Sequence, residues 1–101
     1  MSALHLIGED PALSNGELGG FTEALDKLDL LVVHATFPSD LTDRADVVLP
    51  SSTFAEADGT YTNLERRVQL LSPALGPGGD QDVDWRILSQ IARLMGVEGF
   101  E

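Results

Sequence analysis

The chain has 101 residues, which is enough for one small domain with a single hydrophobic core. Six basic and seventeen acidic side chains give a net charge of −11, and this charge argues against nucleic acid or an anionic membrane surface as a partner. The absence of cysteine excludes disulfides, thiolate metal ligands and an iron–sulfur cluster on this chain. No apolar run approaches the ~18 residues of a membrane span, and the first residues lack the basic start of a signal peptide. We therefore expect a cytoplasmic domain with no direct membrane insertion.

The first half of the sequence predicts a small parallel sheet. Apolar runs at 4–7, 30–35 and 47–49 each end at a glycine, a polar stretch or a proline, as buried parallel strands do. Between the first two runs, four apolar residues recur at helical spacing from Phe21 to Leu28. A short helix from Ser39 or Asp40 to Arg44 precedes the third run. This order predicts a βαβ unit, one half of a Rossmann-like or flavodoxin-like α/β fold, with right-handed crossovers.

The second half predicts a β-hairpin and a C-terminal helix. β-branched and aromatic residues at 60–62 and 68–71 flank a polar centre, which indicates two antiparallel strands. Apolar residues repeat with helical spacing from Val83 to Met95, and Gly96 is a suitable stop. We expect one domain over 1–101, divided into a βαβ core (1–50), a loop and hairpin (51–72), a linker (73–82) and a helix (83–96).

The carboxyl ends of the predicted parallel strands would lie along one edge of the sheet. In open α/β sheets ligands bind in the crevice outside that edge. The turn Gly8-Glu9-Asp10-Pro11 follows the first strand, and its backbone N–H groups could approach a phosphate; a plain surface turn is the alternative.

Four motifs follow one another between residues 45 and 69. They are ADVVLP (45–50), FAE (54–56), GTYTN (59–63) and ERRVQ (65–69). In this order they resemble the molybdopterin-dependent oxidoreductases. That family includes the catalytic subunits of formate dehydrogenase and the large subunit (chain 3) of NADH-quinone oxidoreductase, respiratory complex I.

The resemblance also implies a set of cofactor-binding residues. The turn at 8–11 is similar to the family's G-x-N-P turn beside the guanosine end of a molybdopterin guanine dinucleotide, with Asp10 in place of Asn. Asp10, Ala35 and Leu41 depart from the family pattern, and these departures favour a chain that has lost the cofactor. The implied set comprises Gly8, Glu9, Asp10, Pro11, Ser39, Asp40, Gly59, Thr60, Asn63 and Arg67.

By this resemblance the chain is the C-terminal part of a molybdopterin domain. It would form the scaffold of the cofactor cleft in an electron-transferring subunit and would not be catalytic alone. The alternative is a non-catalytic structural module that docks within a respiratory complex after loss of the cofactor. Its partners would be the remainder of its own subunit and the other subunits of a respiratory or dehydrogenase complex, peripheral to the inner membrane. With two histidines and no cysteine, we expect neither a catalytic residue nor a metal site on this chain.

Overall fold

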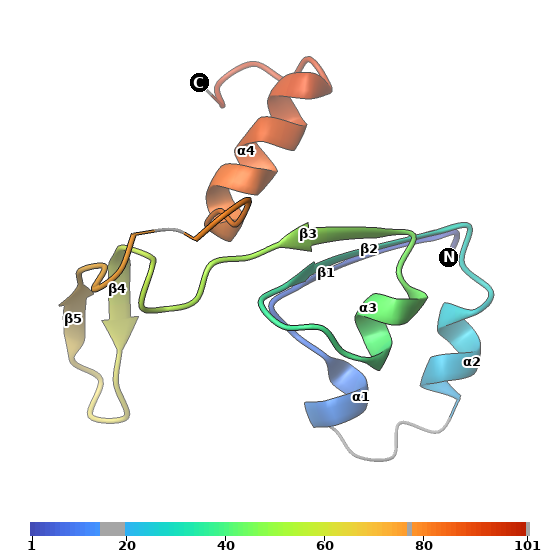
Figure 1. Ribbon diagram of the computed structural model, residues 1–101, viewed down its shortest axis with the longest axis horizontal. Helices are drawn as coiled ribbons and strands as arrows, with labels where there is room; N and C mark the ends of the chain where they lie inside the picture. Colours follow the sequence, from blue (N-terminus) through green and yellow to red (C-terminus); the bar gives the residue numbers. More distant parts are fainter. Residues whose placement is uncertain (15–19, 77, 101) are drawn as a thin grey trace. The chain divides into compact units, whose positions relative to one another are not determined.

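The computed structural model describes residues 1–14, 20–76 and 78–100, and it divides the chain into two compact units (Figure 1). The first unit is Met1–Ser51 and the second is Ser52–Glu101. The expected α/β class is confirmed, since a three-stranded parallel sheet is followed by an antiparallel hairpin and a final helix. Within the described residues, no helix is both long and apolar enough to cross a membrane.

A parallel sheet forms the first unit. Its strands are β1 (Ala3–Ile7), β2 (Leu30–Ala35) and β3 (Val47–Pro50), in the order β1-β2-β3. The helices are α1 (Pro11–Ser14), α2 (Phe21–Leu25) and α3 (Asp40–Arg44). Because both crossovers run in the same direction along the sheet, right-handed connections put α2 and α3 on one face, as Figure 1 shows.

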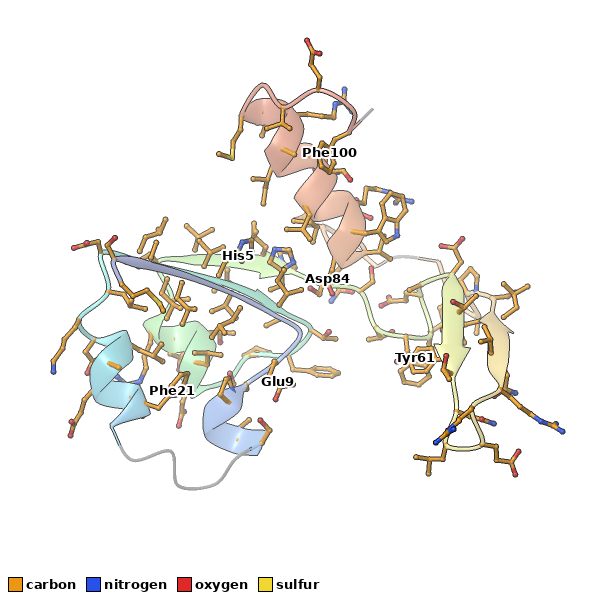
Figure 2. The ribbon with its side chains drawn as sticks, turned by 180° about the vertical axis from the view of Figure 1, so that it is seen from behind. His5, Glu9, Phe21, Tyr61, Asp84 and Phe100 are labelled. Atoms are coloured by element: carbon orange, nitrogen blue, oxygen red, sulfur yellow. The ribbon has the colours of Figure 1, made fainter. Side chains whose placement is uncertain are left out.

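The core of the first unit lies between this face and the helices. Leu31 and Val33 alternate along β2, and both are buried against Leu25 of α2 and Leu41 of α3. Phe21 packs against the same cluster from the start of α2, beneath the sheet in Figure 2. The alternation in β2 therefore aims every second side chain at the helices.

Asp46 fixes the starts of β2 and β3 relative to each other. Its carboxylate Oδ2 accepts a hydrogen bond from the backbone N–H of Leu31 at 2.7 Å. Its own backbone N–H donates to the carbonyl oxygen of Leu31 at 2.9 Å. The Asp of the ADVVLP motif is thus a structural residue that sets the strand register.

The second unit contains β4 (Gly59–Thr62), β5 (Val68–Leu71) and the helix α4 (Asp84–Leu94). Strands β4 and β5 pair in antiparallel fashion, with Thr60 opposite Leu70 and Thr62 opposite Val68. Before β4, the Glu56 carboxylate accepts hydrogen bonds from the backbone N–H and the hydroxyl of Thr53, at 2.8 and 2.9 Å. Since the backbone N–H of Thr53 is the main cause, the pKa of Glu56 lies below its ordinary value. Glu56 is therefore part of a turn.

Several element boundaries differ from those expected. The helix α1 was not expected, because only four residues form it and they follow a loop. Helix α4 spans 84–94, inside the predicted 83–96, and Gly96 adopts a φ of 77° just beyond it. The predicted linker at 73–82 is partly ordered, since Ala74 donates its N–H to the carbonyl of Ala55; Pro77 lies outside the described residues.

Candidate functional site

A crevice opens at the carboxyl ends of β1 and β2. It has a volume of about 340 Å³ and is lined by the β1–α1 loop, the end of β2 and the residues leading into α3. An adjoining hollow of about 470 Å³ extends between the three helices and shares Asp10, Leu13 and Ser39 with it. The turn after β1 and the segment at 35–39 therefore lie at the same edge of the sheet.

Gly8 turns the chain out of the sheet at this edge. Its φ is +63°, which a residue with a Cβ rarely adopts. Its backbone N–H donates to the carbonyl of His34 at 3.2 Å. A Cβ built at Gly8 would meet no atom within 4 Å, so the glycine is needed for its conformation and not for close contact with a neighbour.

Asp10 and Ser39 join the two loops of the crevice. The Ser39 hydroxyl donates to Oδ2 of Asp10 at 3.1 Å, although 29 residues separate the two in sequence. The other carboxylate oxygen, Oδ1, accepts a weak hydrogen bond from the N–H of Leu13 at 3.4 Å. Asp10 therefore holds the start of α1 and the start of α3 together across the sheet edge.

Ser39 is also the N-cap of α3. Its backbone N–H donates to the hydroxyl oxygen of Thr42 at 2.8 Å, and that hydroxyl donates in turn to the Ser39 carbonyl at 2.8 Å. The intervening Leu41 points into the core and is only 4% exposed. Leu41, which departs from the family pattern, therefore packs in the core of the first unit.

Three carboxylates line the crevice or the adjoining hollow, together with several hydroxyl groups and, in the hollow, Arg44. Glu9 and Asp10 line the crevice, Asp40 lines the adjoining hollow, and the Ser14 hydroxyl donates to Glu9. Glu9 lies at the end of β1 in Figure 2. Carboxylates accept hydrogen bonds and repel anions, so the mouth of the crevice fits the N–H donors of a base or amide and does not fit a phosphate.

Four predicted site residues lie in the second unit, on the hairpin. Asn63 closes the loop: its side-chain oxygen accepts from the N–H of Arg67 at 3.0 Å, and its own N–H donates to the Arg67 carbonyl at 3.0 Å. The Arg67 side chain is exposed and lies 3.8 Å from the carboxylate of Glu65. Gly59 and Thr60 begin β4. Of the six predicted residues in the first unit, five line the crevice or the adjoining hollow, whereas Pro11 lines neither and begins α1. Asn63 has a role in the turn of the hairpin.

The sequence analysis did not predict that two histidines lie next to each other. His5 on β1 and His34 on β2 have ring centroids 4.8 Å apart, with ring planes tilted by 51°. Burial, and second the charge of His34, lower the pKa of His5 below its ordinary value of 6.5. The pairing follows from the parallel register, in which Ile7 lies opposite His34, and this register is the signal that would have revealed it. Among the described residues, no three His, Asp or Glu side chains form a group that could hold a metal ion.

Comparison with known proteins shows to which family the chain belongs. The family model for molybdopterin oxidoreductases matches residues 1–94. The F420-dependent formate dehydrogenase 2 subunit alpha of Methanococcus maripaludis is 43% identical over 93 residues, which are 92% of this chain and 14% of that protein. The F420-dependent formate dehydrogenase subunit alpha of Methanocaldococcus jannaschii has the same identity and the same shares. The NADPH-Fe(3+) oxidoreductase subunit alpha of Geobacter sulfurreducens is 44% identical over 91 residues, or 90% of this chain and 11% of that protein.

This chain therefore spans between a tenth and a seventh of the length of these relatives. The match nevertheless covers nearly all of the chain itself and includes the sheet, the crevice and the hairpin. A molybdopterin cofactor is accordingly implied for the parent family. The chain belongs to the molybdopterin oxidoreductase family.

Proposed function

We propose that this chain forms one wall of the cleft that holds the guanosine end of a molybdopterin guanine dinucleotide in an oxidoreductase subunit. The observation that carries the proposal is the crevice at the carboxyl ends of β1 and β2, with the carboxylate of Asp10 held by Ser39 at its mouth. Membership of the family supports a molybdopterin cofactor. When bound, that cofactor supplies the redox chemistry; the chain alone is not catalytic.

Hydrogen-bond chemistry selects the part of the cofactor that this wall would contact. A guanine ring presents adjacent N1–H and N2–H donors, which one carboxylate can accept together. Asp10, with Glu9 beside it, is suited to those donors and would repel the diphosphate. The prediction that Gly59, Thr60, Asn63 and Arg67 also contact the cofactor stays a prediction.

A formate dehydrogenase type of parent is favoured by the names of two of the relatives described above, which are formate dehydrogenase alpha subunits. The NADH-quinone oxidoreductase type stays a prediction. "Subunit alpha" in all three names supports partners of two kinds, the remainder of this subunit and the further subunits of a dehydrogenase complex.

The alternative proposal is a structural docking module that no longer binds the cofactor. It is favoured by the hydrogen bonds that the carboxylate of Asp10 already accepts within the chain, from Ser39 and Leu13. It is also favoured by Leu41, which departs from the family pattern and is buried in the core. The two proposals differ in whether a guanine nucleotide binds at Asp10.

Nitrogen–proton NMR correlation spectra of the chain, recorded with millimolar GDP and with ADP, test this difference. We expect GDP to shift the resonances of 8–10 and 35–40, and ADP to leave them in place, because adenine lacks the paired donors. Asp10→Ala should abolish the GDP response, because it removes both carboxylate oxygens. The matched control is Asp29→Ala, which removes an exposed carboxylate outside the crevice and the adjoining hollow. A folded chain whose spectrum ignores GDP would refute the cofactor wall and favour the docking module.

A further inference from the structure

The hairpin β4–β5 exposes apolar side chains on both of its faces. All four residues of β4 and three of the four in β5 are exposed. Because directly paired residues share a face, Leu70 and Val68 lie together on one side, and Tyr61 lies on the other. Leu70 is 81% exposed, Val68 69% and Tyr61 62%. Figure 2 shows the ring of Tyr61 projecting from β4.

Two strands with no covered face do not form a stable structure by themselves in water. An isolated hairpin is marginal at best, and stability normally requires a third strand or an apolar surface to pack against. Within the described residues, β4 and β5 form a sheet of only two strands. Exposed apolar side chains grouped in this way mark an interaction surface.

The tip of the hairpin presents two arginines in a fixed conformation. Arg66 has a φ of +63°, which is uncommon for a residue with a Cβ and carries a conformational cost. The N–H of Arg66 donates to the carbonyl of Asn63, and the N–H of Arg67 donates to the side chain of Asn63. Leu64, in the same loop, is fully exposed. Hydrogen bonds therefore fix the backbone of this loop, and its apolar side chain and two guanidinium groups are accessible to a partner.

The hairpin also differs in charge from the rest of the chain. Between Gly59 and Leu71 it carries two arginines and one glutamate, a net charge of +1, so the other residues together carry −12. The positive charge of the hairpin is complementary to a negatively charged surface. Guanidinium groups on an exposed tip are suited to bidentate pairing with carboxylates on another protein.

We propose that the β4–β5 hairpin is a docking surface for an acidic protein surface with an apolar centre, located in the part of the oxidoreductase subunit outside this chain. Most of such a subunit lies outside this chain, which matches only 14% of the M. maripaludis subunit, and this supports placing the partner surface there. In the docked state Val68 and Leu70 are covered by the apolar centre. Arg66 and Arg67 pair with carboxylates at its rim.

The test uses the M. maripaludis alpha subunit from which the 93 matched residues have been deleted, mixed with the complete 101-residue chain. The truncated subunit is first shown to be monomeric with a cooperative thermal transition. We expect calorimetry to detect a one-to-one complex that weakens as salt is raised. The double variant Arg66→Glu/Arg67→Glu should bind at least tenfold more weakly.

The matched control is Lys27→Glu/Arg93→Glu, which makes the same two basic-to-acidic changes at exposed residues outside the hairpin. It should change the affinity less than twofold. Absence of binding by the unaltered chain would overturn the proposal. Equal weakening by the control and the double variant would also overturn it, because the effect would then reflect total charge.

Hydrogen exchange of the chain alone provides a second measurement that needs no partner. We expect the amides of β4 and β5 to exchange with little protection, and those of β2 to be protected. A protected hairpin in a dimer, measured by sedimentation, would assign the surface to a second copy and overturn the proposal. A double variant that keeps full affinity for the truncated subunit and loses the response to GDP would instead assign the arginines to the nucleotide.

Discussion

His5 and His34 bring two ionisable rings within 4.8 Å of each other on neighbouring parallel strands. Protonation of His5 is disfavoured in the folded chain, first by burial and then by the charge of its neighbour. In the unfolded chain neither cause operates, so the unfolded state binds the proton more readily. The proximity of the rings therefore makes the folded state sensitive to acid.

From this pair we predict that the free energy of unfolding falls as the pH is lowered through about 6.5, the ordinary pKa of histidine. The sign follows because the folded-state pKa is depressed: the unfolded state gains protons first, and stability is lost toward acid. Urea unfolding monitored by circular dichroism at pH 7.5 and 5.5 measures the change. His5→Gln should reduce the difference between the two pH values. A variant with an undiminished difference would contradict the prediction and place its source in other groups.

Single residues also show where sequence reasoning succeeded and failed. The sequence predicts that the carboxyl ends of the parallel strands lie along one edge of the sheet, because parallel strands align these ends whatever the side chains are. It does not predict the bond from Ser39 to Asp10, which depends on the rotamers of two loop residues. The histidine pair was missed for a related reason, since it depends on the register between β1 and β2 and not on either strand alone.

At the scale of elements, α3 shows how a helix of five residues is held in place. Its start is fixed by the reciprocal bonds of Ser39 and Thr42, and its end by the ion pair of Arg44 with Asp26 at 2.7 Å. The ion pair is exposed on both sides, so its contribution is small, at most about 1 kcal/mol. The buried side chain of Leu41 is therefore the main attachment of α3 to the sheet.

We predict that Leu41→Ala lowers the free energy of unfolding by about 3 kcal/mol, the cost of removing a buried leucine and leaving a cavity. In a chain of this length such a loss removes a large part of the total stability. Urea denaturation followed by circular dichroism measures it. Leu13→Ala makes the same chemical change at a side chain that is 76% exposed, and it should cost less than about 1 kcal/mol. Equal losses in the two variants would show that Leu41 is not the anchor of α3.

Elements were predictable to the extent that a pattern of several residues specifies them. The three parallel strands, the hairpin and α4 each have such a pattern, and each was found. The helix α1 has four residues and begins at Pro11, so its sequence offers no apolar period to detect. The hairpin strands were predicted from β-branched and aromatic residues, but their exposure on both faces was not, because exposure depends on what the strands pack against.

At the scale of the whole molecule, charge opposes the compact state. The chain has seventeen acidic and six basic side chains, and its net charge is −11. Folding brings these like charges closer together, so their mutual repulsion destabilises the folded state. The pairs Arg44–Asp26 and Arg86–Asp82 offset part of it, at distances of 2.7 and 2.8 Å. Because both arginines are partly exposed, these attractions are weak compared with the summed repulsion.

We therefore predict that the chain is stabilised by moderate salt. Raising NaCl from 20 to 300 mM shortens the Debye length from roughly 20 Å to below 8 Å and screens the long-range repulsion. The thermal unfolding midpoint, measured by circular dichroism, should rise by a few degrees. Lys27→Glu, which makes the charge more negative, should increase the rise. A midpoint that falls with salt would show that the ion pairs outweigh the repulsion.

The sequential order β1-β2-β3 has a consequence for the way this chain acquires its structure. Each strand pairs with the strand that follows it along the chain, so the sheet of the first unit contains only neighbouring crossovers. Such an arrangement has a lower contact order than a sheet whose strand order jumps, and a lower contact order favours fast folding. During synthesis the sheet can grow one strand at a time, with each new strand adding to an edge that already exists.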